Sequence, residues 1–393
     1  MLEPTNSLLS VYNRADIVMV RGDGAYLFDK NEKKYLDFAA GIAVNSLGHC
    51  HPKIVEALTK QAQELWHCSN LYRTEGLEKF ATKLTDNSFA DKVFMTNSGT
   101  EAVETGIKMI RRYHYKNGTP KPRIITLTGS FHGRSMACIS AGRSSKAVEG
   151  FEPLLDGFDQ VEFGNIESLR KAIDKETGGI MLETIQGEGG IREHSKQYLQ
   201  EVRKIADEFG LLLLLDEVQC GIGRAGKFFA FENYGITPDI TTIAKGIGSG
   251  FPMGACLATE KAASGMTKGS HGGTYGGNPL ATAVGNAVLE IILAEGFIEN
   301  IAKNGIILKN SLQEIAKGLP QIIEEVRGVG LMLGIKTKIP AQEAVNAFRE
   351  NGLLTVASAS DNVIRLLPPL IIDESHIAEA VKIIKNSINK LGI

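Results

Sequence analysis

The chain has 393 residues, of which 43% are hydrophobic and 22% are charged, and its 43 Lys and Arg nearly balance 45 Asp and Glu. At about 150 residues per domain, this length predicts two or three domains with a sizeable core, and the hydrophobic content excludes a largely disordered chain. The formal net charge of −2 gives no general attraction to nucleic acid or to anionic membranes.

Five cysteines are scattered along the chain without a C-x-x-C pair. They argue against a disulfide framework or a cysteine-rich zinc site and favour a reducing compartment. The histidines show no metal-ligand spacing, so no metal site is expected. Residues 1–16 do not resemble a signal peptide, and the longest stretch without Asp, Glu, Lys or Arg contains Asn278, Pro279 and many glycines, which a membrane span would not. We therefore expect a cytoplasmic globular protein without a nucleic-acid or membrane partner.

The first part of the chain predicts a hairpin and then alternating helices and strands. Two apolar strands surround a polar turn at residues 29–34, and His51–Pro52 opens a helix with an apolar face. Strands are then predicted from short apolar runs at 92–97, 123–129, 178–185, 211–217, 239–245 and 254–259. Helices are predicted over 101–116 and along an apolar stripe that ends at Gly210. This alternation is typical of a mostly parallel sheet covered by helices.

The C-terminal part predicts a smaller α+β unit. A long helix begins at Asn278–Pro279, with an N-cap followed by a proline, and Gly296 is expected to end it. A helix to about Lys317, strands near 326–335 and 362–369, and a last helix from Asp373 follow. We divide the chain into an N-terminal segment belonging to the small domain, a large domain and a C-terminal small domain, with bounds at 1–49, 50–296 and 297–393.

Two charged residues stand where predicted strands end. Asp216 closes a buried strand, at the edge where open α/β sheets bind ligands, and a buried carboxylate there needs a cationic partner. Lys245 ends another strand before the turn GIGSG, and a lysine beside a substrate can act as an amine nucleophile. With a phosphate site nearby, this pair meets the requirements of pyridoxal 5'-phosphate (PLP), because the lysine holds the aldehyde and the aspartate keeps the pyridine nitrogen protonated. Taken singly, Asp216 could equally cap the next element, and Lys245 could be solvated.

Two segments are candidate phosphate sites. Ser98-Gly99-Thr100 lies between a predicted strand and a helix N-terminus, where backbone N–H groups and the helix dipole favour an anion. An ordinary N-cap is the alternative interpretation of this segment. Thr274, which stands among glycines just before a predicted helix, is the second candidate.

Two other nucleotide-binding motifs are not met. No GxGxxG fingerprint is present at either candidate segment, so a nicotinamide site has little support. The stretch GIGRAGKF resembles a P-loop, but Phe228 replaces the metal-binding Ser or Thr. Its glycines also follow the strand that would be Walker B instead of preceding it, which argues against an NTPase.

Seven motifs occur along the chain, namely NSGTEA, SFHGR, ETIQGEGG, DEVQCGIGR, IAKGIG, GGTYGGNPLA and NVIRLLPPL. By this ordered set the chain resembles the class III PLP-dependent aminotransferases over essentially its whole length. The resemblance implies an α/β protein of PLP-dependent transferase fold type I, in which a large domain with a mostly parallel sheet is joined by a smaller α+β domain from both termini. It also implies a homodimer that acts on small-molecule substrates.

The resemblance further implies roles for individual residues. Lys245 resembles the Schiff-base lysine and Asp216 the partner of the pyridine nitrogen, so these two are the expected catalytic residues. The other expected cofactor contacts are Gly99, Thr100, Phe131, Glu217, Val218, Gln219 and, from the second subunit, Thr274. The expected substrate contacts are Arg134, Gly273, Arg365 and Glu188, of which Glu188 would cover Arg365 while a terminal amine reacts. His132 and Glu183 are expected to lie behind these contacts.

Within the family, motifs at both ends of the chain are similar to the acetylornithine subgroup. This implies transamination of N2-acetyl-L-ornithine with 2-oxoglutarate, giving N-acetyl-L-glutamate 5-semialdehyde and L-glutamate in arginine biosynthesis. Succinylornithine, succinyldiaminopimelate, ornithine or 4-aminobutyrate as amino donor would use the same residues and stays open. A PLP-dependent aminomutase, which recycles its amino group internally, and a non-catalytic binding module are alternatives of other classes.

Overall fold

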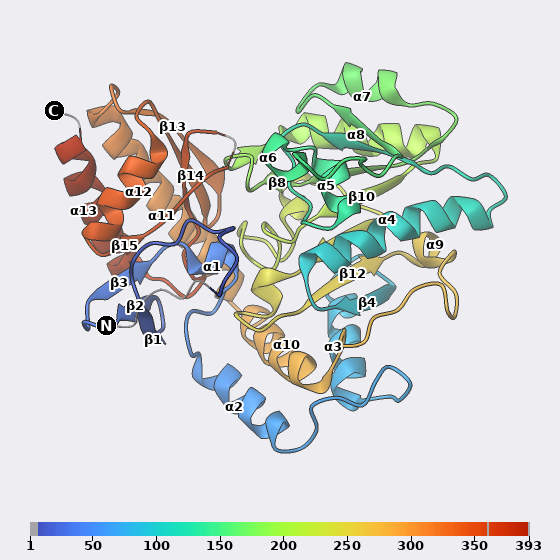
Figure 1. Cartoon of the computed structure of the whole chain (residues 1–393), viewed down its shortest axis with the longest axis horizontal. Coiled ribbons are helices and arrows are strands. Elements are labelled where there is room, and N and C mark those ends of the chain that lie inside the picture. The colour runs from blue at the N-terminus through green and yellow to red at the C-terminus, as the bar shows by residue number, and fades with distance from the viewer. Residues whose placement is uncertain (1–6, 360, 392–393) are drawn as a thin grey trace.

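A seven-stranded sheet forms the centre of the larger part of the molecule (Figure 1). The computed structural model describes residues 7–359 and 361–391. In order across the sheet, the strands are β4 (Lys92–Thr96), β12 (Gly254–Ala258), β11 (Ile240–Ile243), β10 (Leu212–Asp216), β7 (Thr177–Glu183), β5 (Arg123–Leu127) and β6 (Phe158–Val161). The five from β11 to β6 run parallel, whereas β12 is antiparallel to both of its neighbours. The expected mostly parallel sheet is confirmed, and β10 is buried throughout, as in a sheet covered on both faces.

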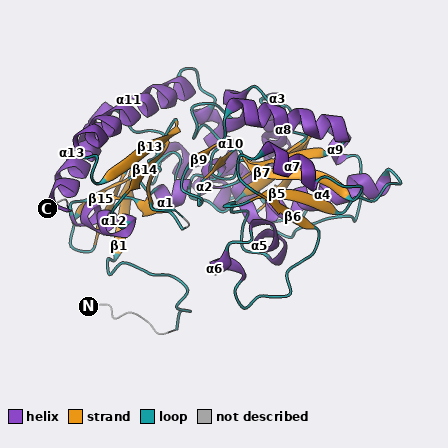
Figure 2. Ribbon diagram, turned by 90° about the horizontal axis from the view of Figure 1, so that it is seen from above, coloured by secondary structure: helices purple, strands orange, loops and turns teal. Residues whose placement is uncertain are grey.

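Helices lie on both sides of this sheet (Figure 2). The helices of this part of the chain are α2 (Pro52–Ala62), α3 (Glu75–Asp86), α4 (Gly99–Lys116), α5 (Met136–Gly142), α6 (Ser145–Val148), α7 (Ile166–Ala172), α8 (Lys196–Phe209), α9 (Glu260–Ala263) and α10 (Pro279–Ile292). α8 ends at Gly210, which adopts a left-handed φ of 64°, as predicted. α4 begins at Gly99 and not at Glu101, because the Ser98 side chain accepts a hydrogen bond from the Glu101 N–H and caps the helix there.

The junction between α10 and α11 (Phe297–Gly318) differs from the prediction. α10 ends at Ile292 and not at Gly296, and Gly296, with a φ of 80°, stands at the start of α11 instead. This left-handed conformation is one that glycine adopts without steric cost. Within the described residues, no single helix is long and apolar enough to cross a membrane; α10 and α11 meet that test only as a pair bent by 70°.

The chain forms two four-stranded sheets, and the first of them combines strands from both ends of the chain. The first has the order β1 (Met19–Asp23), β2 (Tyr26–Asp29), β3 (Lys34–Asp37) and β15 (Leu353–Leu354). The second has the order β13 (Ile323–Val329), β14 (Met332–Thr337), β17 (Val363–Leu366) and β16 (Val356–Ala357), and α12 (Ala341–Glu350) and α13 (Glu374–Leu391) belong to the same region. The predicted hairpin of β2 and β3 is confirmed. β15 runs parallel to β3 with Leu353 opposite Leu36, so residues from both ends of the chain share one sheet.

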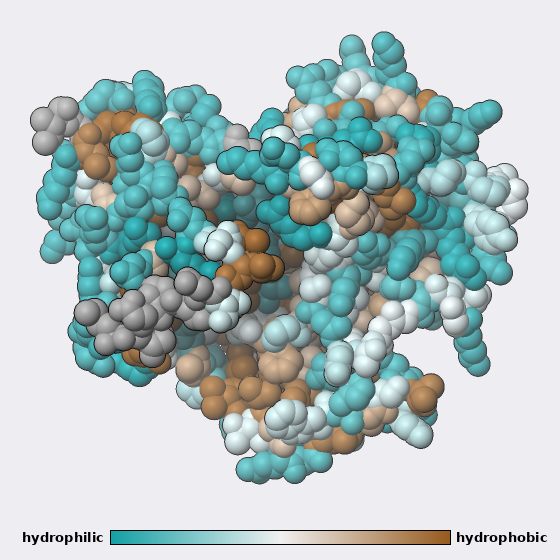
Figure 3. All heavy atoms as spheres, viewed as in Figure 1, coloured by the Kyte–Doolittle hydropathy of each residue, from teal (hydrophilic) through white to brown (hydrophobic). Residues whose placement is uncertain are grey.

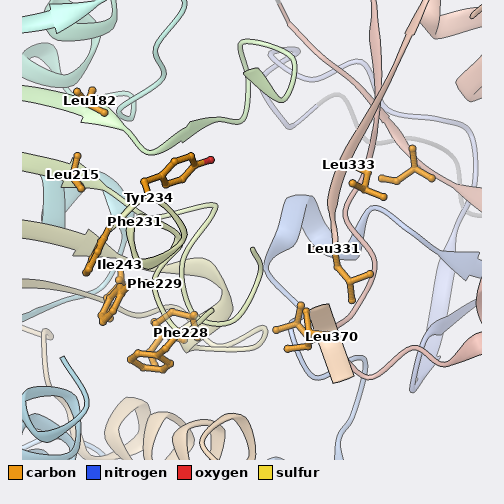
Figure 4. Close-up of a cluster of buried hydrophobic side chains, with 14 of the residues drawn as sticks. Leu182, Leu215, Phe228, Phe229, Phe231, Tyr234, Ile243, Leu331, Leu333 and Leu370 are labelled. Atoms are coloured by element: carbon orange, nitrogen blue, oxygen red, sulfur yellow. The ribbon is translucent and has the colours of Figure 1, made fainter. Parts of the chain in front are cut away.

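One hydrophobic core joins the large sheet to the C-terminal sheet (Figure 4). Leu215 lies on β10 of the large sheet, and the rings of Phe229 and Phe231 stack beside it with centroids 5.1 Å apart. Leu331, just before β14, and Leu333, within β14, lie across from them. Because the core is continuous, the division of the chain at residues 49 and 296 stays a prediction.

Arg224 crosses the same junction as a buried cation. Its guanidinium Nη1 donates to the carbonyl oxygens of Leu331, at 2.9 Å, and Pro368, at 2.5 Å, and only 2% of the residue is exposed. Burial lowers the pKa of this guanidinium. The loop that follows Asp216 is therefore fixed to the chain segments next to β14 and β17.

The contact between α4 and β10 leads to a stability prediction. A Cβ atom on Gly106 in α4 would approach Cδ1 of Leu214 to 2.3 Å. Alanine stabilises a helix by about 1 kcal/mol relative to glycine, but overpacking a core costs about 1–3 kcal/mol, so we expect Gly106→Ala to lower the thermal unfolding midpoint. Gly318→Ala at the end of α11, where no atom lies within 4 Å of the added Cβ, is the control that should not lower it. Equal midpoints for wild type and Gly106→Ala would contradict the close packing.

Candidate active site

A cavity of about 320 Å³ lies where β4, β7, β10 and β11 end. The carboxyl ends of parallel strands meet at one edge of a sheet, so residues far apart in the sequence converge there. The predicted site residues that line the cavity are Gly99, Thr100, Phe131, Asp216, Val218, Gln219 and Lys245. The structure therefore brings together most of the residues that were expected to contact a cofactor.

Lys245 follows β11 and starts a short 3-10 helix, Lys245–Ile247. Its φ of 46° is left-handed, a conformation that costs a non-glycine residue about 1–2 kcal/mol. Burial lowers the pKa of the Lys245 ammonium; the negative charge of Glu188 opposes this effect, and the positive charge of Arg365 adds to it. A lowered pKa keeps a larger fraction of the lysine neutral, as a nucleophile or a base requires.

Asp216 is buried at the end of β10, where its carboxylate is held by several donors. Its Oδ1 accepts hydrogen bonds from the Val218 N–H, at 3.1 Å, and the Thr242 hydroxyl, at 3.3 Å. Its Oδ2 lies 2.8 Å from Nδ1 of His132. Burial alone would lower the pKa of His132, but the hydrogen bond to Asp216 and the charges of Asp216 and Glu183 outweigh it, so that the pKa is raised. The sequence placed His132 behind the site but did not predict this contact.

Glu183, at the end of β7, also lines the cavity. Its two carboxylate oxygens accept hydrogen bonds from the backbone N–H groups of Phe131, at 2.9 Å, and Gly187, at 3.0 Å. Burial raises the pKa of Glu183 to about 7, although the charge of His132 lowers it. The available sequence signal was its place at a strand end, and in the sheet it stands opposite Asp216. Glu183 thus ties the loop that carries Phe131 to the segment that follows β7.

The other end of the cavity is formed by Ser98, Gly99 and Thr100. Oγ of Ser98 accepts the N–H of Glu101 at 3.3 Å, so α4 presents its capped N-terminus to the cavity. A Cβ atom on Gly99 would lie 2.7 Å from Cγ1 of Val218, so a side chain there would displace Val218 from the cavity wall. The first N–H groups of a helix lack partners within it and favour an anion.

Arg365 and Glu188 form an ion pair near Lys245, whose pKa both of them affect. Nη1 of Arg365 donates to Oε1 of Glu188 at 2.5 Å, and Nη2 donates to Oε2 at 3.1 Å. The Arg365 side chain, on β17, is 1% exposed, whereas the Glu188 side chain is 21% exposed. Glu188 lies in the turn of a hairpin between β8 (Ile185–Gln186) and β9 (Arg192–Glu193). Arg365 can bind another carboxylate with the same fork only after Glu188 moves.

Arg365 and Glu188 do not line the cavity, and neither do four other predicted residues. The Glu217 carboxylate accepts the Ala230 N–H at 2.6 Å and so supports the protein backbone, and burial raises the pKa of Glu217 to about 7. Gly273 and Thr274 are exposed on the loop that precedes α10. Arg134 is exposed as well, with its guanidinium carbon 5.2 Å from the Phe131 ring centroid, next to a residue that does line the cavity.

The chain is similar to known enzymes over nearly its full length. The model of the family Aminotransferase class-III matches residues 10–388. The chain is 55% identical to an acetylornithine aminotransferase from Agrobacterium fabrum, over 94% of this chain and 93% of that protein. It is 53% identical to one from Brucella melitensis, over 98% and 96%.

Two solved structures share the fold. An ornithine aminotransferase from Toxoplasma gondii has a TM-score of 0.94 at 27% identity, covering 98% of this chain and 93% of that one. An N-acetylornithine aminotransferase from Stenotrophomonas maltophilia has a TM-score of 0.84 at 36% identity, covering 98% of each chain. The predicted fold type I is confirmed. The chain belongs to the class III aminotransferases, enzymes that depend on pyridoxal phosphate.

Proposed function

We propose that this enzyme transfers the δ-amino group of N2-acetyl-L-ornithine to 2-oxoglutarate, a step of arginine biosynthesis. The names of the similar enzymes support this amino donor. The observation that carries the proposal is the ion pair of Arg365 and Glu188 beside Lys245. An enzyme whose two substrates react at chemically different carbons needs a carboxylate-binding arginine that can be covered and uncovered.

The residues around the cavity fit the cofactor. Bound PLP supplies an aldehyde and a protonated ring that withdraws electrons from the carbon bearing the amine. Lys245 would hold the aldehyde and Asp216 the ring nitrogen, with the phosphate at the N-terminus of α4. Phe131 and Val218 would cover the two faces of the ring. Gln219 has a buried Oε1 without a partner among the described residues, and a polar group without a partner is suited to a ligand in the cavity that it lines.

Lys245 also serves as the base. Its amine would carry a proton away from the substrate carbon that bears the nitrogen. The lowered pKa of Lys245 favours the neutral form that accepts this proton. His132, whose Nδ1 lies 2.8 Å from Oδ2 of Asp216, would keep this carboxylate in place for the ring nitrogen.

The two substrates then use the arginines differently. Acetylornithine reacts at a terminal carbon without a neighbouring carboxylate, so Glu188 stays on Arg365, and Arg134 binds the distant carboxylate. 2-Oxoglutarate reacts at the carbon next to its α-carboxylate, which takes the place of Glu188 on Arg365. Arginine suits both positions because its planar fork binds a carboxylate with two hydrogen bonds.

A homodimer in the cytoplasm is part of the proposal. α2 buries none of its residues, and the segment after it exposes Trp66, Leu71 and Tyr72 by 64%, 84% and 70%. Tyr275, next to Thr274, is 61% exposed, and hydrophobic surface gathers over the α2 and α10 region in Figure 3. Exposed apolar surface of this kind marks a protein interface, and a second copy would cover it while bringing Thr274 to the phosphate site of its partner.

The amino donor can be tested directly. We expect kcat/KM with 2-oxoglutarate to be highest for acetylornithine in a panel with succinylornithine, succinyldiaminopimelate, ornithine and 4-aminobutyrate. Lys245→Ala is the control, and it should lose turnover with every donor while keeping its fold and some non-covalent binding of PLP. If another donor gave a higher kcat/KM, that donor would be the substrate in place of acetylornithine. If no glutamate were released, an aminomutase would be favoured.

The dimer is tested through Thr274. Thr274→Ala removes the hydroxyl proposed to bind the partner's phosphate site, so PLP should dissociate faster from this variant, whereas Thr274→Ser keeps the hydroxyl and should resemble wild type. Absorbance after gel filtration measures the retained PLP, and sedimentation equilibrium measures the mass. A fully active monomer would contradict the proposed assembly.

The role of Glu188 predicts a change in preference. Glu188→Ala leaves Arg365 uncovered, so kcat/KM of the half-reaction with glutamate should rise relative to that with acetylornithine. The loss of one charged partner changes such a preference by roughly 30- to 1,000-fold. Arg365→Lys should shift the ratio the other way, because an ammonium does not reproduce the fork. Stopped-flow absorbance gives each half-reaction separately, and an unmoved ratio in Glu188→Ala would make Glu188 structural.

A further inference from the structure

The hairpin of β8 and β9 carries Glu188 at a tight turn. Ile185 pairs with Glu193 and Gln186 with Arg192, so residues 187–191 form the tip. Within the tip, the N–H groups of residues 190 and 191 both donate to the carbonyl oxygen of Gly187, at 3.1 and 3.3 Å. The backbone of the tip therefore moves largely as a unit, and whatever fixes it also restrains Glu188.

Arg327, on β13, fixes this tip. Its Nε and Nη2 donate to the carbonyl oxygen of Gly190 at 2.8 and 2.6 Å, and Nη2 also donates to Oδ2 of Asp361 at 2.6 Å. The Arg327 side chain is 16% exposed. A Cβ atom on Gly190 would lie 2.9 Å from Nη2 of Arg327 and 3.0 Å from Cβ of Asp361, so the tip is packed directly against both residues. We call Arg327 and Asp361 the bracket.

The bracket touches both chain segments of the ion pair. Gly190 follows Glu188 closely in the tip, and Asp361 lies just before β17, which carries Arg365. The residue after Arg327 adds a second link, because the Gly328 N–H donates to Oε1 of Glu193 at 2.7 Å. Charged hydrogen bonds of this geometry are among the stronger contacts in proteins. The contacts of Arg327 and Gly328, both on β13, thus restrain the distance between the Glu188 backbone and Arg365.

We propose that Arg327 is a positioning residue that controls how readily Glu188 leaves Arg365, and hence the relative use of the two substrates. This rests on the proposed function of Glu188 as the cover of Arg365. With the bracket intact, the tip is held close to β17 and the ion pair is favoured. Without the bracket, the backbone of the tip is less restrained, and the state in which Glu188 pairs with Arg365 is less stable relative to the open state. A dicarboxylate then binds Arg365 more easily.

The test uses Arg327→Met, which keeps the length of the side chain but cannot donate hydrogen bonds. Glu325→Gln is the matched control, because it alters another contact of the same guanidinium, at 3.4 Å and on an exposed side chain, and leaves the bracket intact. Asp361→Asn weakens the bracket from its other side and serves where Arg327→Met does not fold. Arg327→Lys keeps a hydrogen-bond donor, so its behaviour should lie between that of wild type and that of Arg327→Met.

Two measurements on the holoenzyme separate positioning from general damage. The dissociation constant of glutarate, an unreactive dicarboxylate, should fall about three- to tenfold in Arg327→Met, with a matching rise in the ratio of the glutamate to the acetylornithine half-reaction. Amide hydrogen exchange across residues 187–191 should speed up in Arg327→Met and stay unchanged in Glu325→Gln. Equal losses in both half-reactions, or unchanged glutarate binding, would overturn the proposal.

A double variant distinguishes this proposal from the one on which it rests. In the Glu188→Ala background, Arg327→Met should not change the ratio further, because there is no cover left to release. If Glu188→Ala alone leaves the ratio unmoved, the cover itself is wrong and the bracket falls with it. If Glu188→Ala shifts the ratio but Arg327→Met does not, the cover stands and only the bracket is overturned.

Discussion

A negative charge buried at the end of β10 sets the arrangement of the site. An isolated carboxylate in this position would be strongly disfavoured, so Asp216 is surrounded by donors, and His132 is held 2.8 Å away with its pKa raised. Glu183 adds to the field at His132 and also binds the backbone of Phe131 and Gly187. The loop that carries Phe131 and the segments that follow β7 and β10 are therefore connected through one network of charges. The segment leading to Glu188 starts from that network, so the cavity and the ion pair of Glu188 and Arg365 share their supports.

The elements that could be predicted from the sequence are those determined by local pattern. β10 is a run of leucines ended by a charge, and α8 is an amphipathic stripe ended by Gly210, so neither depends on distant residues for its recognition. β6 and α3 were not predicted, because β6 has four residues and is defined by its pairing with β5, and α3 buries only Phe80 and Leu84. Gly296 was expected to end α10 but stands at the start of α11, because a glycine in the left-handed conformation can precede a helix as well as follow one.

In the site, too, local pattern predicts some residues, whereas contacts between distant residues could not be predicted. Asp216 and Lys245 could be predicted because each stands near the end of an apolar strand. Gly99, Thr100 and Thr274 could be predicted because they stand next to a helix start, and the resemblance to the family supplied the other positions. The contacts between residues could not be predicted: His132 and Asp216 are 84 residues apart, and Glu188 and Arg365 are 177 apart. Which carboxylate meets which cation depends on how the strands order themselves across the sheet. That order also places Glu217 against the backbone, although it is the sequence neighbour of Asp216.

The pairing of β3 with β15 has a consequence for the order in which the chain acquires its structure during synthesis. The seven-stranded sheet uses only residues between 92 and 258 and can assemble once these have left the ribosome. β3 must wait for Leu353, which is translated long after Leu36. Until then one edge of β3 has unpaired N–H and C=O groups, and pairing over such a long sequence separation is slow. The hairpin of β2 and β3 is thus made before the seven-stranded sheet but reaches its final neighbours after it.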